Sequence, residues 1–241
     1  VMSSRVRLAR NLKGAAFPGW AKKPERIKTL ETLRPAIQNL PEMAEAFSRH
    51  RLDITVLHKS PLPMCKLESE SQRIILDELH RNRVNFVGSA AVSDIQIDEG
   101  IATKVITPKG TFEADLILLA LGFEPNTGIA EVSRIRCGVS GGIIVDSRMR
   151  TNLENIYAAG ACTEVRNTVS NKPIYLPLGN IANKMGWIAG ENIAGQISEF
   201  PGVIRTTAVK IFDLEVASVG LHSHEAETCG FRVVTESVMA Y

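Results

Sequence analysis

The 241-residue sequence lacks several features that would place a chain quickly in a functional class. Aromatic residues make up only 5% and the net charge is +2, so neither a base-stacking surface nor a basic field for nucleic acid is expected. No stretch approaches the roughly 18 apolar residues that a membrane span needs. Arg5, Arg7 and Arg10 stand near the start without a following apolar segment, so no secretion signal is expected.

Metal-type spacing of cysteine and histidine is also missing. The four cysteines are scattered, at Cys65, Cys137, Cys162 and Cys229. No C-x-x-C pair occurs, and the histidines show no ligand spacing with carboxylates: His50, His80, His222 and His224. We therefore expect no metal site, reduced thiols and a cytoplasmic location.

What the sequence does contain is the pattern of a packed α/β protein, with 44% hydrophobic and 22% charged residues. Periodicity predicts helices over 42–49 and 68–82 and strands over 52–58, 84–87, 92–97, 102–107 and 111–121. The strands at 92–97 and 102–107 flank a turn at Asp98-Glu99-Gly100. This β-α-β order with an added antiparallel piece is that of a small dinucleotide-binding domain.

The remaining segments are assigned in the same way. The basic stretch before residue 42 is helix-prone, with an apolar period from Ile27 to Ile37. Further strands are predicted over 141–145, 155–159, 207–212, 215–219 and 231–235. A helix is predicted over 178–196, with Asn180 as its N-cap.

Several motifs in fixed order carry a family resemblance. They are Ala114 to Thr127, Gly142 to Asp146, Asn155-Ile-Tyr-Ala-Ala-Gly160, Pro177-Leu-Gly179, Ala182 to Gly195, and Phe200 to Leu221. Together they resemble FAD-dependent pyridine nucleotide-disulfide oxidoreductases, most closely the coenzyme A-disulfide reductase and NADH oxidase branch. The resemblance covers about 42–241 and implies an α/β fold with incomplete Rossmann-like portions. It divides into a partial NAD-binding domain (42–125), the C-terminal part of an FAD-binding domain (126–198) and the start of an α+β dimerisation domain (199–241).

The same resemblance implies a set of cofactor-binding residues and a reaction class. The residues are Gly160, Ala161, Cys162, Pro177, Leu178, Gly179 and Ala182. The family places a ribitol-binding Asp where this sequence has Ala161, and Cys162 is interpreted as a buried apolar residue rather than a redox centre. The implied reaction is hydride transfer from NAD(P)H through FAD to a disulfide or oxygen, and the last segment implies a homodimer through 199–241. The alternative is a plain parallel-sheet core with a glycine turn.

Two glycine loops of the family are missing. No G-x-G-x-x-G occurs, and Gln38 to Pro41, before the helix that should follow the NAD loop, contains no glycine. His58-Lys59 replaces the usual acidic residue at the end of the second strand, which suits either the 2′-phosphate of NADP or a solvated strand end. No remaining cysteine stands at the family's redox position. We therefore expect FAD binding that is weakened or lost, NAD(P)H binding that is lost, and a truncated protein with impaired activity.

Residues 1–41 resemble a different family. Ser3-Ser4-Arg5-Val6-Arg7-Leu8-Ala9-Arg10-Asn11 is similar to the signature of bacterial protein-arginine kinases, relatives of phosphagen kinases. The resemblance implies that Ser4, Arg5 and Arg7 hold ATP phosphates, since guanidinium groups match phosphate oxygens bidentately. The alternative is a basic solvated segment. Kinase activity is not expected without the rest of the phosphate cradle, and a non-enzymatic assembly module is the third hypothesis.

Overall fold

The computed structural model describes residues 5–9, 40–50, 52–120 and 122–238. The chain forms two compact units. The first combines Val1–Gly122 with Ala208–Ala217, and the second combines Phe123–Thr207 with Ser218–Tyr241. Within the described parts of the chain, no helix is long and apolar enough to cross a membrane.

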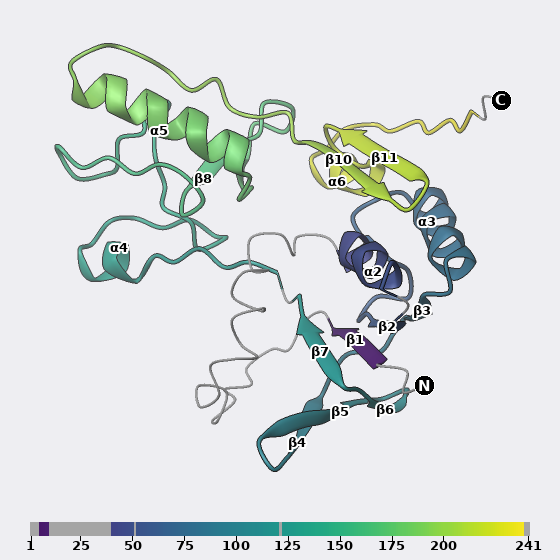
Figure 1. Ribbon diagram of the computed structural model, residues 1–241. Helices are drawn as coiled ribbons and strands as arrows, with labels where there is room; N and C mark the ends of the chain where they lie inside the picture. The colour runs from purple at the N-terminus through teal and green to yellow at the C-terminus, as the bar shows by residue number, and fades with distance from the viewer. Residues whose placement is uncertain (1–4, 10–39, 51, 121, 239–241) are drawn as a thin grey trace. The chain divides into compact units, whose positions relative to one another are not determined.

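The first unit is organised around a four-stranded parallel sheet with the order β3-β2-β1-β7 (Figure 1). Its strands are β1 (Arg5–Ala9), β2 (Asp53–Leu57), β3 (Asn85–Val87) and β7 (Leu116–Leu119). Helices α2 (Leu40–Ser48) and α3 (Ser69–Arg81) precede β2 and β3 in the chain. This is the 3-2-1-4 order of one half of a dinucleotide-binding fold, and it confirms the α/β prediction.

The N-terminal basic segment contributes the strand between β2 and β7. Arg5 is in register with Asp53, Ala9 with Leu57, and Ala9 also with Leu119. The segment that was expected to stand apart over 1–41 therefore shares a sheet with residues 53–119. The helix predicted from Ile27 to Ile37 lies outside the described residues.

Apolar residues of β2 divide between the two faces of this sheet. Ile54 and Val56 belong to a core with Ile75 and Leu79 of α3. Leu57 belongs to a second core, on the side of the antiparallel sheet β4-β5-β6. Because successive side chains of a strand point to opposite faces, one strand serves both cores.

The antiparallel sheet consists of β4 (Asp94–Asp98), β5 (Ile101–Thr107) and β6 (Gly110–Glu113). The turn between β4 and β5 is Glu99-Gly100, with φ of 51° and 80°. Positive φ at both positions is the signature of a two-residue hairpin turn, so the predicted hairpin is confirmed. The single strand predicted over 111–121 is in fact two, since β6 turns back on β5 before β7 enters the parallel sheet.

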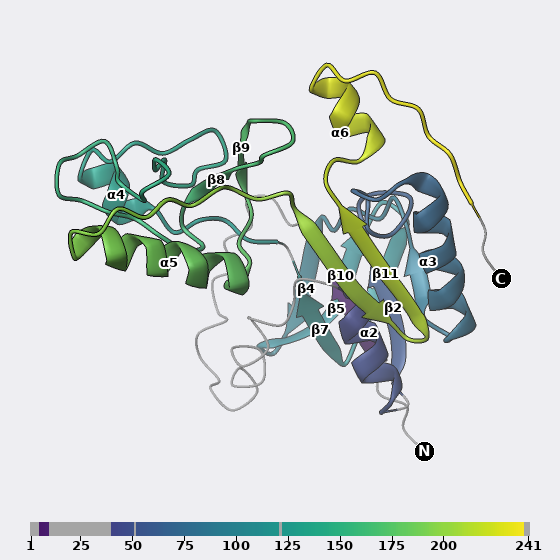
Figure 2. The ribbon, with the colours of Figure 1, turned by 90° about the horizontal axis from the view of Figure 1, so that it is seen from above.

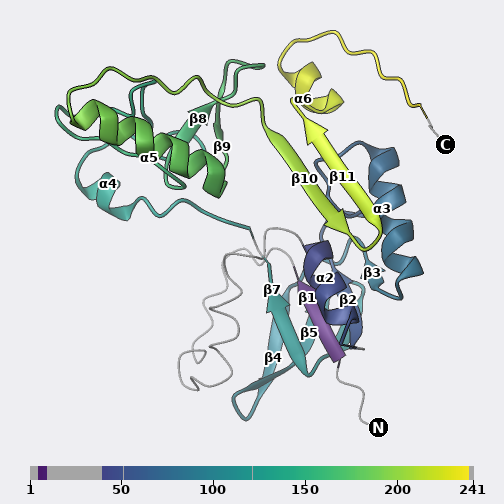
Figure 3. The ribbon, with the colours of Figure 1, turned by 45° about the horizontal axis from the view of Figure 1, so that its top comes forward.

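The central part of a late hairpin, Ala208–Ala217, completes the first unit (Figure 3). The hairpin consists of β10 (Thr206–Ile211) and β11 (Leu214–Val219), and Ile211 is fully buried in the core that holds α2 and α3. The backbone N–H of Phe212 donates to Glu45 Oε2 at 2.8 Å, and that of Asp213 donates to Glu78 Oε1 at 3.4 Å. The strands predicted here are confirmed, and they pack on the dinucleotide-type unit. The homodimer through 199–241 stays a prediction.

The second unit has little regular structure besides one long helix (Figure 2). Its elements are α4 (Gly128–Val132), β8 (Glu164–Arg166), β9 (Pro173–Tyr175), α5 (Gly179–Ile193) and α6 (Ser223–Thr228). Its core gathers six buried residues: Met149, Val165, Met185, Ala189, Phe200 and Val203. Residues of α5 and of the loops on either side of it therefore hold this unit together.

Three predicted strands of the second unit are wrong. Residues 141–145 make only isolated bridges, from Ile143 to Cys137 and to Thr163, and residues 155–159 make one, from Tyr157 to Arg150. Residues 231–235 form no strand. The sequence of each segment favours an extended backbone, but a strand needs a partner over several consecutive residues, and the bridges found here are isolated.

Candidate functional site

The residues from Gly160 to Cys162 form a short backbone edge in the second unit. Gly160 has φ of 97°, a conformation that side chains with a Cβ rarely adopt, so glycine is required there. Its carbonyl oxygen accepts hydrogen bonds from the Thr163 backbone N–H at 3.1 Å and from Thr163 Oγ1 at 2.8 Å. The Cys162 carbonyl accepts from the Ile143 N–H at 2.8 Å. The edge is therefore fixed from one side by two main-chain bonds and one bond from the Thr163 hydroxyl.

This edge lies next to the first turn of α5. A Cβ added to Gly160 would lie 3.8 Å from the Cβ of Ala182, which is ordinary van der Waals contact. Ala161 is exposed, and Gly160 and Ala182 are half-buried. The structure thus brings together two of the predicted cofactor-binding positions that are 22 residues apart, and it leaves a small-residue surface between them.

The N-terminus of α5 follows Pro177 and Leu178. Leu178 is the N-cap residue in extended conformation, and no side chain caps the helix there. Asn180 is the second residue of the helix, and its Oδ1 accepts from the Ile181 N–H at 2.9 Å. The prediction of Asn180 as N-cap is therefore wrong, because the helix already begins at Gly179. The partial positive charge of this helix end favours an electron-rich group.

The fit of these residues to FAD is partial. The open edge at Gly160 and Ala161 and the helix end at Leu178 and Gly179 offer backbone close to a flat polar ligand. Ala161 offers no carboxylate for a ribitol hydroxyl, and the sequence offers no glycine loop for a pyrophosphate. The described residues therefore match the flavin-facing side of such a site and not its phosphate-binding side.

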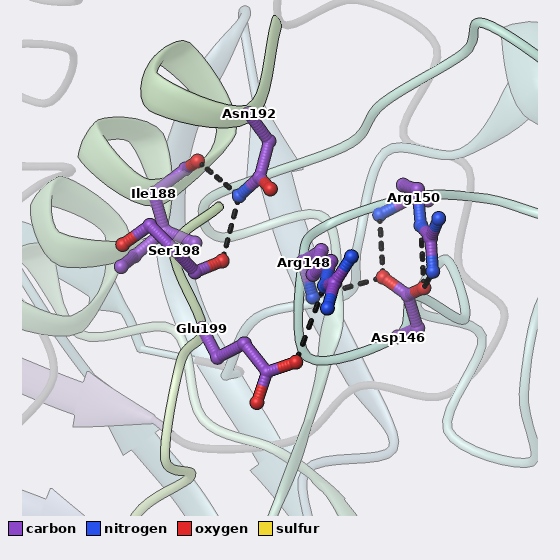
Figure 4. A network of polar contacts seen from close by, with 7 residues as sticks. All are labelled: Asp146, Arg148, Arg150, Ile188, Asn192, Ser198 and Glu199. Carbon is purple, nitrogen blue, oxygen red and sulfur yellow. Dashed lines mark hydrogen bonds and ion pairs between the residues drawn. The ribbon is translucent and has the colours of Figure 1, made fainter. Parts of the chain in front are cut away.

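A network of charged residues holds the loop that precedes this edge (Figure 4). Asp146 Oδ1 accepts from the backbone N–H groups of Arg148 and Arg150, each at 2.9 Å, and Asp146 Oδ2 pairs with the Arg150 guanidinium at 2.7 Å. Burial raises the pKa of Asp146, but the hydrogen bonds from Arg150 and Arg148 outweigh it and hold that pKa below 3.8. Arg148 also pairs with Glu199 at 3.2 Å.

The C-terminal end of α5 is tied to the same loop. Asn192 Nδ2 donates to the carbonyl oxygens of Ile188 at 2.8 Å and Ser198 at 2.7 Å, which closes the turn after the helix (Figure 4). The backbone N–H of Phe200 donates to the Ser147 carbonyl at 2.7 Å. Asn192 therefore satisfies carbonyl groups at the end of the helix, and the sequence analysis did not identify Asp146 as an organiser of this loop. The signal was present as Asp146 four residues before Arg150.

His58 and Lys59, the pair predicted to face a nicotinamide cofactor, occupy two different environments in the first unit. His58 follows β2 and is only 3% exposed, and its Nδ1 accepts from the Ser60 N–H at 3.1 Å. Its ring lies 6.0 Å from that of Phe86. Lys59 is exposed. A phosphate approaching this strand end would therefore meet Lys59, while the His58 imidazole is built into the turn.

The predicted ATP-phosphate residues are described only in part. Ser4 lies outside the described residues, and Arg5 and Arg7 belong to β1, whose backbone pairs with β2 and β7. The cysteines in the described parts of the chain are free, and no group of histidine, cysteine and carboxylate suited to a metal ion is found there. Cys162 is half-buried, and burial together with the nearby Cys162 thiol raises the pKa of Tyr175.

Comparison with known proteins places this geometry in a family. Residues 41–175 match the family model described as pyridine nucleotide-disulphide oxidoreductase. The chain is 36% identical over 199 residues to a CoA-dependent NAD(P)H sulfur oxidoreductase of Pyrococcus furiosus, covering 83% of this chain and 45% of that protein. It is 34% identical to an NAD(P)H coenzyme A polysulfide/persulfide reductase of Pyrococcus horikoshii, covering 83% of this chain and 44% of that protein.

A solved structure supports the same family assignment. An NAD-dependent persulfide reductase from A. fulgidus aligns with a TM-score of 0.77 and 31% identity, over 95% of this chain and 38% of that chain. The chain therefore spans less than half the length of these relatives. The match over more than half of its own residues shows that this chain belongs to the pyridine nucleotide-disulphide oxidoreductase family.

Proposed function

We propose that the chain carries the flavin-facing half of a site for NAD(P)H-dependent reduction of a sulfur substrate such as a disulfide or persulfide. The observation that carries this proposal is the placement of Gly160 beside Ala182 at the uncapped start of α5. The named activities of the Pyrococcus relatives favour sulfur over other acceptors. The chemistry that a bound FAD supplies is electron transfer from a nicotinamide to the acceptor.

The chain itself would hold FAD through backbone contacts. The groups that would hold a flavin are the backbone of Gly160 to Cys162 and the first N–H groups of α5, which need no ionised side chain. Ala161 lacks the carboxylate of the family, which removes a hydrogen bond worth about 0.5–1.5 kcal/mol. That loss corresponds to roughly three- to tenfold in affinity.

Impaired catalysis is the second part of the proposal. A pyrophosphate is normally bound by backbone N–H groups of a glycine loop at a helix N-terminus. The 241 residues contain no G-x-G-x-x-G, so neither FAD nor NAD(P)H finds its usual phosphate loop in this chain. We expect weak FAD binding and no NAD(P)H turnover above that of free FAD.

A titration tests both parts. The purified chain is mixed with increasing FAD, and flavin absorbance and fluorescence are followed, with an Ala182→Leu variant as control because its longer side chain would occupy the small-residue surface beside Gly160. Saturable binding that the variant loses supports the proposal. A wild-type chain that leaves the flavin spectrum unchanged at high protein concentration refutes it. NADH and NADPH oxidation with coenzyme A disulfide as acceptor then tests for turnover.

We do not propose kinase activity. The resemblance behind it is confined to residues 1–41, and the part of it that is described, Arg5–Ala9, forms a strand of the dinucleotide-type sheet. Phosphoryl transfer also needs several phosphate ligands beyond one short basic segment.

A further inference from the structure

A buried carboxylate lies directly behind the proposed flavin-facing edge. Glu164, the first residue of β8, is only 6% exposed. Its Oε1 accepts a hydrogen bond from the Ser140 backbone N–H at 2.9 Å and another from the Ser140 hydroxyl. A buried carboxylate is costly unless it is hydrogen-bonded, so the turn that contains Ser140 is what makes this position tolerable.

Two glycines of that turn, Gly138 and Gly142, lie against Glu164. A Cβ on Gly138 would overlap the Glu164 carboxylate, and a Cβ on Gly142 would lie 3.0 Å from Glu164 Cγ. The Gly138 N–H donates to the Gly142 carbonyl at 2.8 Å, which closes the turn, and Gly141 has φ of 82°. The turn from Gly138 to Gly142 is therefore a glycine cradle shaped around one side chain.

The cradle continues into the backbone of the edge itself. The Ile143 N–H donates to the Cys162 carbonyl at 2.8 Å, and the Glu164 N–H donates to the Ile143 carbonyl at 3.0 Å. Thr163, between them, donates twice to the Gly160 carbonyl. The Glu164 side chain thus binds the turn at one end while its backbone binds the residue that follows the turn.

We propose that Glu164 is a positioning residue. It fixes the Gly160–Cys162 edge for a flavin because its side chain accepts hydrogen bonds from the 138–142 turn. This inference rests on the proposed function, because the ligand of the edge is FAD. Both Ser140 donors reach one oxygen atom of Glu164. A glutamine retains an oxygen acceptor at this position, whereas an alanine removes the acceptor of both donors.

The experiment compares Glu164→Ala and Glu164→Gln with two controls. Glu154→Ala removes an exposed carboxylate from the same unit. Asn167→Ala destabilises the same unit at a different place, because Asn167 is fully buried and its Oδ1 accepts from two backbone N–H groups. Two quantities are measured for each variant: the FAD dissociation constant, and the hydrogen-exchange rates of the backbone amides at positions 143 and 164.

We expect Glu164→Ala to raise the FAD dissociation constant and the exchange rate of the Ile143 amide about tenfold, which corresponds to roughly 1.4 kcal/mol. Glu164→Gln should stay within about threefold of the wild type, which is below 0.7 kcal/mol. Asn167→Ala should lower stability without weakening FAD binding to the same degree. Equal weakening of FAD binding by Asn167→Ala and Glu164→Ala would show a merely structural role and would overturn the proposal.

A double substitution tests the cradle directly. Gly138→Ala should accelerate Ile143 exchange in the wild type, because the new methyl group and the Glu164 carboxylate compete for one space. In the Glu164→Ala background the same change should add little, since the carboxylate is gone. Additive effects would contradict the cradle.

The two proposals fail in distinguishable ways. If the wild-type chain binds no FAD, the proposed function fails, and the inference that Glu164 serves a flavin fails with it. The exchange data then show whether the cradle still orders the edge. If the wild type binds FAD and Glu164→Ala binds it within twofold of the wild type, the positioning role fails while the proposed function stands.

Discussion

Replacing Ile211 with alanine tests whether the β10–β11 hairpin is part of the dinucleotide-type unit. Ile211 is fully buried in the core that contains α2 and α3. The substitution removes three carbon atoms, and at about 0.8 kcal/mol for each buried CH₂ group the transfer loss is about 2.4 kcal/mol. The remaining cavity brings the expected total into the range of about 2–5 kcal/mol seen for such changes.

Urea unfolding measures this loss. With a slope of about 2 kcal/mol per molar urea, a loss of about 3 kcal/mol lowers the midpoint by about 1.5 M. Hydrogen exchange of peptides from α2 and α3 shows whether the loss occurs in this unit. Val219→Ala is the control, because Val219 belongs to the same hairpin and is 65% exposed. A midpoint for Ile211→Ala within 0.3 M (about 0.6 kcal/mol at that slope) of the wild type would refute the packing of the hairpin on α2 and α3.

Three further changes have defined outcomes. Leu8→Pro removes a backbone donor from β1, which lies between two strands, so exchange protection of β2 and β7 should fall, and unchanged protection would contradict the sheet order. Gly160→Ala must place a Cβ at φ of 97°, so the second unit should lose about 1–3 kcal/mol in urea unfolding, and a neutral result would refute the strained turn. Burial raises the pKa of Glu225, but its hydrogen bonds and ion pair with Arg205 hold that pKa below 4.5. The stability that this ion pair contributes should be present above pH 4.5 and should be lost as the pH falls through the folded-state pKa of Glu225. Arg205→Ala should therefore reduce the dependence of the unfolding free energy on pH in acid-unfolding curves.

The sequence predicted the first unit well because its signals are local. The apolar period of residues 68–82 predicted the helix that the structure shows as α3, and Glu99-Gly100 predicted the turn between β4 and β5. The position of β1 could not be predicted from the basic composition of its segment. A parallel strand is selected by neighbouring backbones as well as by its own side chains, and those neighbours lie 48 and 110 residues further along the chain.

The second unit was harder to predict for a related reason. Residues 141–145 and 155–159 have strand-like sequences, yet the structure gives them single bridges instead of ladders. The pairing of Gly160 with Ala182 followed from the family resemblance and not from spacing. Burial of Glu164 could not be expected from its residue type, because glutamate is rarely buried. The three glycines at 138, 141 and 142 were the available signal, since a cluster of glycines marks a turn where backbone and side chains approach closely.

Replacing Ala161 with aspartate restores the carboxylate that the family carries at this position. If the Gly160–Cys162 edge faces a flavin, Ala161→Asp should add a hydrogen bond to the ribitol. We predict that FAD titration of the Ala161→Asp variant gives a dissociation constant about three- to tenfold lower than the wild-type value, the effect of roughly 0.5–1.5 kcal/mol. An unchanged or higher dissociation constant, in a variant that remains folded, would contradict a flavin-facing edge at these residues.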